Sequence, residues 1–349
     1  MSLRTVALLG FGRFGRALSW ILEESGVAVR AFDPGVSVPA AMRAGSIGEL
    51  VSGAEAVILA VPVAALDAAV AALRPHLDAT HLVLDVGSVK EGPEQILRSR
   101  LGREVPWVAT HPLFGPACLA RGERPLRVVV CPNELHPAEP ARGLYTQIGC
   151  EIIEQSAEEH DRVMARTHVL TFFIAKGLMA IGADADVPFA PPSFQALHRS
   201  LEAVRVDAGH LFWAIQHENP FAEEERRRFI GALEEIDDEV RRTPRTAPES
   251  GTKLDIPGLA EPSPDLKEAR ELIDEVDREI VGLLARRAQL ALRAGAAKAQ
   301  VQRAVRDPER EKALLASRGA WASEVGLEGE PVREIFEAVM RWSRGLQRR

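Results

Sequence analysis

The chain has 349 residues, of which 46% are hydrophobic, so it is long enough for two or three domains with sizeable cores and is not a disordered chain. Its formal net charge of −7 argues against a nucleic-acid or anionic-membrane partner, because both need clustered positive charge. The odd number of cysteines suits free, structural thiols in a reducing compartment, and the three lack the spacing of metal ligands: Cys118, Cys131 and Cys150.

The apolar stretches near the N-terminus do not have the pattern of export or membrane segments. The chain enters the run VALLG within a few residues, which leaves no room for a cleavable signal peptide. The stretch AVILAVPVAAL is interrupted by Pro62 and is much shorter than the roughly 20 residues that span a bilayer. We therefore expect a cytoplasmic protein without a membrane partner.

Residues 1–150 alternate β-branched apolar runs with Ala- and Leu-rich stretches of helical period. The runs are TVALLG, VAVRAFD, AVILAV, HLVLDV, PWVAT and RVVVCP. Such alternation predicts βαβ units and a mostly parallel, Rossmann-type α/β sheet. From 151 to 243 the strand signals vanish, and stretches such as HDRVMARTHVLTFFIAKGLMAIGA and EEERRRFIGALEEIDDEVRR predict an all-helical second domain.

The remainder of the chain divides into a linker and a helical tail. Residues 244–264 contain five prolines and few apolar residues, which predicts a linker. Asp265 can cap a long helix that runs to about residue 302, and further helices are expected to begin at Asp307–Pro308 and near Glu330–Pro331. Residues 265–349 therefore predict an all-helical domain of three helices.

The segment GFGRFG, residues 10–15, lies between a predicted strand and an amphipathic stretch, as a dinucleotide-binding fingerprint requires. Gly10 permits a tight turn, Gly12 lets a pyrophosphate approach the backbone, and Gly15 allows close helix packing. Asp33 ends the next strand, where a carboxylate accepts a hydrogen bond from a ribose 2′-hydroxyl and repels a 2′-phosphate. We expect these four residues to bind NAD rather than NADP.

Ser88 and His111 both follow predicted strands, in the segments GSVKEG and HPLFGP. Open α/β sheets bind ligands at the carboxyl ends of their strands, so the two side chains should face one crevice. A neutral imidazole there can take the proton of a substrate hydroxyl while hydride leaves the same carbon, and Ser88 is positioned to orient that imidazole. The alternative is that His111 is a loop histidine satisfied by backbone groups.

These segments, together with EEHDRVMA and VRVDAGHLFWAIQHEN, resemble the prephenate dehydrogenase family over residues 3–243. The resemblance implies that His111 polarises the substrate's 4-hydroxyl, that Ser88 binds it, and that Arg205 grips a substrate carboxylate, a task that suits the planar guanidinium. The alternative interpretation is that Arg205 is a surface arginine on a helix.

The chain departs from that family in two places. Many relatives carry SHxPH where this chain reads THVLTF, so a second histidine near the substrate is lost or replaced by His168. The gap between Arg205 and the segment LFWAIQHEN is also shorter. We interpret the other histidines of this region as core or surface residues, and no pair of them has metal-site spacing: His160, His198, His210 and His217.

The first helix of the tail carries three basic residues whose spacing is informative. Arg287 and Lys298 are 11 residues apart, which places them within about 20° of one helix face. Arg270 lies 17 residues before Arg287, about 25 Å away, so the two cannot grip one small ligand. If both are functional, Arg270 must serve a site in a second copy of the chain.

The stretches LLARRAQLALRAGAAK and VRDPERE resemble the all-helical class of chorismate mutases over residues 265–349. The resemblance implies a homodimer with shared mutase sites, in which arginines clamp carboxylates, a lysine and a glutamine donate to an ether oxygen, two acids bind a ring hydroxyl, and a serine assists. Such a cage holds the reactive conformer and stabilises developing charge without metal or redox cofactor. The implied residues are Arg270, Arg287, Lys298, Asp307, Arg310, Glu311, Ser343 and Gln347. The alternative is that these charges are solvated and pair locally.

The two resemblances fit together, because a chorismate mutase makes prephenate and a prephenate dehydrogenase consumes it. They imply a bifunctional enzyme of tyrosine biosynthesis that converts chorismate to prephenate and then, with NAD, to 4-hydroxyphenylpyruvate. Three alternatives stay open: an arogenate or cyclohexadienyl dehydrogenase, a β-hydroxyacid dehydrogenase with a non-catalytic helical tail, and a regulatory protein that keeps only the mutase.

Overall fold

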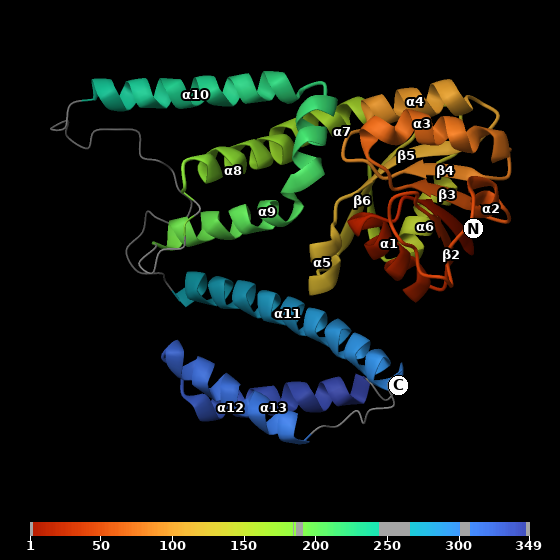
Figure 1. Ribbon diagram of the computed structural model, residues 1–349. Helices are drawn as coiled ribbons and strands as arrows, with labels where there is room; N and C mark the ends of the chain where they lie inside the picture. The colour runs from red at the N-terminus through yellow and green to blue at the C-terminus, as the bar shows by residue number, and fades with distance from the viewer. Residues whose placement is uncertain (1–2, 184, 186–190, 244–265, 301–307, 347–349) are drawn as a thin grey trace. The chain divides into compact units, whose positions relative to one another are not determined.

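The computed structural model describes residues 3–183, 185, 191–243, 266–300 and 308–346 (Figure 1). The chain forms two compact units, Met1–Leu119 with Pro125–Ala247 and Ala120–Arg124 with Pro248–Arg349. The predicted linker 244–264 lies outside the described residues, and so do Asp307 and Gln347. Arg270 and Lys298 are described as helical positions only.

A seven-stranded sheet forms the core of the N-terminal part of the first unit, at the right of Figure 1. Its neighbours pair in parallel in the order β2-β1-β3-β4-β5-β6-β7, except that β5 and β6 are antiparallel. The predicted, mostly parallel Rossmann-type sheet is therefore confirmed. The strands are β1 (Thr5–Leu9), β2 (Ala28–Phe32), β3 (Ala56–Leu59), β4 (Leu82–Asp85), β5 (Trp107–Pro112), β6 (Leu126–Cys131) and β7 (Cys150–Glu154).

Strand β7 lies at Cys150–Glu154, where the sequence pattern predicts no further strand, so this part of the prediction is wrong. The segment CEIIE pairs in parallel with β6 from Leu126↔Cys150 to Val130↔Glu154. Its first residue is buried, but both glutamates are exposed, because β7 lies at the edge of the sheet. Edge strands lack the continuous apolar run of a strand buried on both faces, so the signal in the sequence is weak.

The sheet is buried on both faces, as the apolar strands predict. In β1, Val6 and Leu8 belong to one hydrophobic cluster, and Ala7 and Leu9 belong to another. The first cluster includes side chains of α1 (Arg13–Glu24) and α6 (Glu139–Gln147), and the second those of α2 (Ile47–Val51), α3 (Val63–Leu73) and α4 (Glu91–Leu101). The chain runs from β1 out to β2 and back to β3 on the other side of β1, which creates a ligand-binding switch point at their carboxyl ends.

The helical part of the first unit comprises α7 (Ala157–Met164), a π-helical turn η2 (Ala165–Val169), α8 (Leu170–Ala180), α9 (Pro192–Glu218) and α10 (Ala222–Arg242). The run Ala157–Ala180 is long and apolar enough, by length and composition alone, to cross a membrane. However, it contains the buried polar residues His160 and Asp161, and its apolar side chains Val169 and Phe172 pack with those of α9. One such helix is weak evidence of a membrane span, and these contacts show that part of it packs within the protein.

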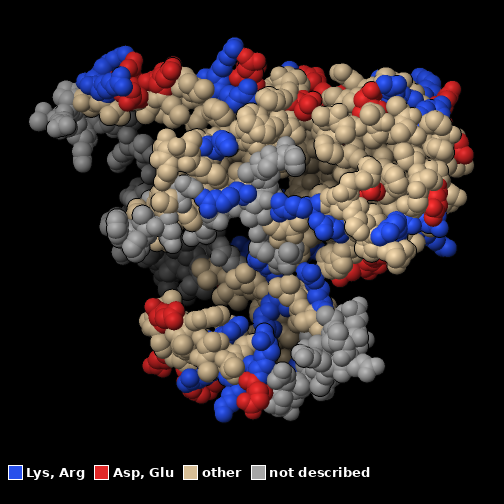
Figure 2. All heavy atoms as spheres, in the orientation of Figure 1, with Lys and Arg blue, Asp and Glu red and all other residues tan. Residues whose placement is uncertain are grey.

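Helix α10 displays charges of both signs along its length, at the top of Figures 1 and 2. Three ion pairs have i,i+4 spacing: Glu223 with Arg227, Asp237 with Arg241, and Asp238 with Arg242. Such pairs stabilise an exposed helix by only a few tenths of a kcal/mol each, about 0.2–0.5 kcal/mol. They explain why this charged segment is helical without a large buried face.

The second unit consists of α11 (Leu266–Gln300), α12 (Pro308–Glu324) and α13 (Gly329–Leu346). The three predicted helices are confirmed, and α12 begins at Pro308, as the Asp-Pro pair predicts. Because α11 is unbroken, Arg270 and Arg287 are held about 25 Å apart along one rod, the separation expected from their spacing.

Candidate active sites

Each of the three glycines in the loop after β1 is a glycine for a different physical reason. Gly10 has φ +100°, and a Cβ there would lie 2.3 Å from the carbonyl oxygen of Ala60. A Cβ on Gly15 would lie 2.3 Å from the carbonyl oxygen of Gly10, whereas one on Gly12 would meet nothing within 4 Å. The first and third glycines are therefore required by packing, while Gly12, the N-cap of α1, leaves backbone open where a helix N-terminus favours an anion.

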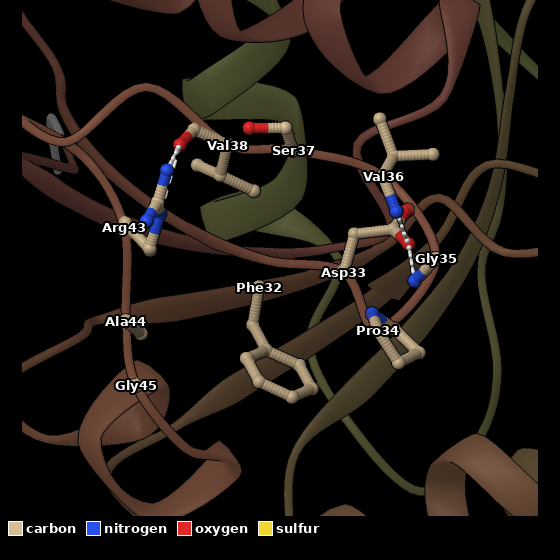
Figure 3. A pocket seen from close by; sticks show the side chains of 10 residues that line it. All are labelled: Phe32, Asp33, Pro34, Gly35, Val36, Ser37, Val38, Arg43, Ala44 and Gly45. Carbon is tan, nitrogen blue, oxygen red and sulfur yellow. Dashed lines mark hydrogen bonds between the residues drawn. The ribbon is translucent and has the colours of Figure 1, made fainter.

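Asp33 lies at the end of β2 in a cavity of about 440 Å³ (Figure 3). Its carboxylate accepts hydrogen bonds from the backbone N–H of Phe11 at 2.7 Å, Gly35 at 2.8 Å and Val36 at 2.9 Å. On the opposite side of the cavity, Arg43 donates from Nε and Nη2 to the carbonyl oxygen of Val38. The carboxylate is thus fixed beside the glycine loop, where a ribose would lie.

His111, on β5, is the first member of a buried chain of hydrogen bonds. Its Nδ1 lies 2.8 Å from Nε2 of His160, and Nδ1 of His160 lies 2.8 Å from Oδ1 of Asp161. The carboxylate of Asp161 also accepts from the backbone N–H of Lys90 at 2.8 Å and of Glu91 at 2.9 Å. Burial, with the nearby charge of His160, lowers the pKa of His111 well below its usual value, so the imidazole is neutral at pH 7.

The local sequence explains why His160 and Asp161 point inward. Ser156 caps α7 in a capping box, since its hydroxyl accepts from the N–H of Glu159 and the Glu159 carboxylate accepts from the N–H of Ser156. This box fixes the start of the helix, so Glu158 and Glu159 face solvent while His160 and Asp161 are fully buried. The sequence analysis interprets His160 as a core or surface histidine; it is in the core, but it also contacts the candidate base.

His168 lies in the π turn η2, close to the same imidazole. Its ring stacks against that of His111 with centroids 6.4 Å apart, and its edge-to-face contact with Phe172 has centroids 4.8 Å apart. Burial, followed by the charge of His160, lowers the pKa of His168 to about 4. The structure thus brings His168 next to His111, in the place where the sequence leaves a second histidine open.

The structure does not show the contacts predicted for Ser88 and Arg205. Ser88 is half-buried in the turn after β4, but the hydrogen-bond partner of His111 Nδ1 is Nε2 of His160 and not Ser88. Arg205 lies on an exposed face of α9. Their contacts with substrate remain predictions.

Lys90, in the SVK segment, is a buried cation that ties β4 to β5. Its Nζ donates to the carboxylate of Asp85 and, at 2.6 Å, to the carbonyl oxygen of Thr110. Both charged side chains are almost fully buried. This pair holds the strand ends from which Ser88 and His111 follow.

Replacing Lys90 with methionine should leave the Asp85 carboxylate buried without its counter-ion. We expect the free energy of unfolding of the first unit to fall by about 3–5 kcal/mol, as urea denaturation would measure. Arg100→Met, which removes the exposed pair with Asp67, is the matched control and should change stability far less. Equal effects of the two substitutions would contradict a special role for Lys90.

In the second unit, Arg287 on α11 reaches α13. Its Nη1 donates to the hydroxyl of Ser343, which donates in turn to the carbonyl oxygen of Val339 at 2.8 Å. Burial, and then the charge of Arg318, lowers the pKa of the Arg287 guanidinium. Neither arginine has a carboxylate partner within the described part of the chain, so the two cations form an electropositive spot inside the helical unit.

Arg318 is a residue that the sequence analysis missed. Its guanidinium lies 4.5 Å from the ring centroid of Trp321 and 5.7 Å from that of Phe336, and its Nε is buried without a hydrogen-bond partner. It follows Glu311 by seven residues, which places the two on one helix face, so helical spacing could have indicated it.

One charged residue of the VRDPERE segment forms an ion pair with α13. Glu311 accepts a hydrogen bond at 2.6 Å from Nη1 of Arg344, on α13, a partner that the sequence analysis did not name. Arg310 is exposed on α12. Of the eight implied mutase residues, the structure therefore joins Arg287 to Ser343 and links Glu311 to the same helix, while four lie outside the described side chains: Arg270, Lys298, Asp307 and Gln347.

Comparison with known proteins identifies both units. Residues 27–139 match the family model for the prephenate dehydrogenase nucleotide-binding domain, and residues 269–348 match that for chorismate mutase type II. A probable arogenate/prephenate dehydrogenase of Methanocaldococcus jannaschii is 27% identical over 199 residues, which are 54% of this chain and 44% of that protein. The chain thus spans less than half the length of this relative.

Two relatives match the C-terminal helices. The isochorismate pyruvate lyase of Pseudomonas aeruginosa is 38% identical over 77 residues, 22% of this chain and 75% of that protein. The T-protein of Haemophilus influenzae is 35% identical over 78 residues, 22% of this chain and 21% of that protein.

A solved structure supports the fold of the first unit. The prephenate dehydrogenase from A. aeolicus, in complex with hydroxyphenyl propionate and NAD+, aligns with a TM-score of 0.55 at 18% identity, over 69% of this chain and 92% of that one. The chain therefore contains a nucleotide-binding domain of the prephenate dehydrogenase type, at residues 27–139, and a chorismate mutase type II domain, at residues 269–348.

Proposed function

We propose that this protein is a bifunctional enzyme of tyrosine biosynthesis. Its C-terminal unit rearranges chorismate to prephenate, and its first unit oxidatively decarboxylates prephenate with NAD to 4-hydroxyphenylpyruvate, CO2 and NADH. One observation carries the proposal: a single chain joins the two families whose reactions are consecutive. We place the enzyme in the cytoplasm, because both matched domains are those of metabolic enzymes.

In the dehydrogenase, the protein's task is to bind, orient and deprotonate the substrate. The open backbone at Gly12 and the fixed carboxylate of Asp33 suit a dinucleotide, which supplies the hydride acceptor when it is bound. The neutral His111 takes the proton of the substrate's 4-hydroxyl as hydride leaves the ring. Loss of CO2 accompanies this step because it yields an aromatic ring. Ser88 binds the same hydroxyl, and Arg205 binds a carboxylate.

In the mutase, catalysis rests on holding a dicarboxylate in its folded conformer. Arg287, oriented by Ser343, provides a partly desolvated cation for one carboxylate. Arg270 is about 25 Å away on the same helix, so it serves the site of a second copy in a homodimer. The exposed apolar side chains of α11 support such a dimer, since Val276, Val281 and Leu283 are each more than half exposed.

Prephenate rather than arogenate is the substrate we propose, because prephenate is what the adjoining unit produces, whereas arogenate requires an intervening transamination. A second candidate for the C-terminal unit is an isochorismate pyruvate lyase, which the 38% identity favours. Parallel assays decide both points: prephenate against arogenate with NAD, and chorismate against isochorismate with pyruvate release as readout. Preference for arogenate, or pyruvate release from isochorismate without turnover of chorismate, would contradict the proposal.

Asp33 should determine the preference for NAD over NADP. We expect Asp33→Asn to lower kcat/KM for NAD by about tenfold, because one charge-assisted hydrogen bond to the ribose is lost. The same substitution should raise kcat/KM for NADP, because the 2′-phosphate is no longer repelled and can lie near Arg43 in the same cavity. Steady-state kinetics with both nucleotides measures the ratio. Asp78→Asn is the control, since Asp78 also accepts a backbone N–H of its own loop but lies outside this cavity. An unchanged NAD to NADP ratio would exclude Asp33 as the selector.

A further inference from the structure

We propose that His160 and Asp161 are positioning residues that fix the tautomer of His111, an inference that rests on the proposed dehydrogenase function of the first unit. The three side chains form a continuous buried chain with two contacts of 2.8 Å. None of the three is more than 5% exposed, so water does not compete for these hydrogen bonds. Neither family resemblance nor sequence spacing assigns a role to His160, which is 49 residues from His111.

The direction of each hydrogen bond follows from the far end of the chain. The Asp161 carboxylate is held from two sides by the N–H groups of Lys90 and Glu91, at the start of α4, so its oxygens act as acceptors. Nδ1 of His160 must then carry the proton and donate to Asp161. A neutral imidazole has one donor and one acceptor, so Nε2 of His160 accepts.

The same rule then fixes His111. Because Nε2 of His160 accepts, Nδ1 of His111 must donate, and the unprotonated nitrogen of His111 is its Nε2. That nitrogen is the one left to take a proton from a substrate hydroxyl. When it does so, the Nδ1–H bond to His160 stays in place, and the Asp161 charge stabilises the imidazolium through one intervening ring. No proton has to move along the chain.

Other groups near His111 do not provide this orientation. His168 stacks nearly parallel to the ring, with an interplanar angle of 20°, so it faces the π surface and not Nδ1. Lys90 directs its Nζ at Asp85 and Thr110. Lys90 instead contributes its backbone N–H to Asp161, which couples the SVK segment to the HD pair of α7.

Two substitutions at His160 separate orientation from packing. Glutamine can place its amide oxygen at the position of Nε2 and still accept from Nδ1–H of His111, whereas methionine has similar bulk and no comparable acceptor. We expect His160→Met to lower kcat for NAD-dependent prephenate oxidation by about 10²-fold or more, and His160→Gln to retain activity within about tenfold of the wild type. Mutase activity of the same chains, which depends on the other unit, should be unchanged.

Nitrogen-15 NMR of the full chain labelled at histidine reports the tautomer directly, with the His111 signals assigned by their absence in His111→Asn. The expected result is a protonated Nδ1 and an unprotonated Nε2 for His111 in the wild type and in His160→Gln, and loss of this preference in His160→Met. A protonated Nε2 in the wild type, or equal activity of the two variants, would overturn the inference. Because the tautomer is measured without substrate, a wild type with the expected tautomer but no prephenate oxidation would refute the proposed function and not the positioning of His111 by His160 and Asp161.

Discussion

His111→Asn should lower kcat for prephenate oxidation by about 10³-fold, because asparagine keeps a polar side chain of similar size but cannot take up the substrate's proton. The affinity for NADH, measured by fluorescence titration, should stay the same, since the residues expected to bind the dinucleotide, the glycine loop and Asp33, follow β1 and β2, whereas His111 is on β5 and is hydrogen-bonded to His160. The mutase rate of the variant should also be unchanged.

A matched control for this variant is His136→Asn. His136 is a half-buried histidine whose Nε2 donates to the carbonyl oxygen of Gly102, and its described contacts do not include a residue of the candidate site. It should lose little activity. Loss of nucleotide binding in His111→Asn would show that this residue is structural, and full activity would exclude it as the base.

Arg287→Ala should lower kcat/KM of the mutase by about 10²–10³-fold, the typical effect of removing one preorganised donor from a charged transition state. Arg270→Ala should have an effect of the same order, although its position on α11 is about 25 Å away. Arg341→Ala, which removes an exposed arginine of α13, is the control and should have a small effect.

Mixing the two inactive variants tests whether they share one site. In a heterodimer of Arg270→Ala and Arg287→Ala, one site loses both arginines and the other retains both. Random exchange of subunits should therefore restore about a quarter of wild-type mutase activity. No recovery after refolding the mixture would mean that each chain builds its own site.

The main elements of the fold could be predicted because the sequence patterns they depend on are local. Strands buried on both faces give continuous apolar runs, and β1, β3 and β4 have every interior position buried. The turn at Gly10 and the start of α12 at Pro308 follow from backbone restrictions of single residues. Strand β7 was missed because an edge strand with exposed glutamates lacks such a run.

The side-chain contacts of the sites were less accessible to prediction, because they join residues distant in sequence. The bond from His111 to His160 spans 49 residues, and that from Glu311 to Arg344 spans 33. Spacing shows which residues share a helix face, but it does not show which face meets another element. The interpretation of His160 as a core or surface histidine therefore includes its observed burial but does not identify its partner.

The central claim is that one chain carries out two consecutive reactions. Its most direct test is to supply the full-length protein with chorismate, with and without NAD, and to follow chorismate loss and NADH absorbance together. Without NAD, chorismate should disappear and prephenate accumulate; with NAD, NADH should form at the expense of chorismate, and 4-hydroxyphenylpyruvate should appear in equal amount. Chorismate that persists under both conditions, or that disappears while added prephenate yields no NADH, would contradict the claim.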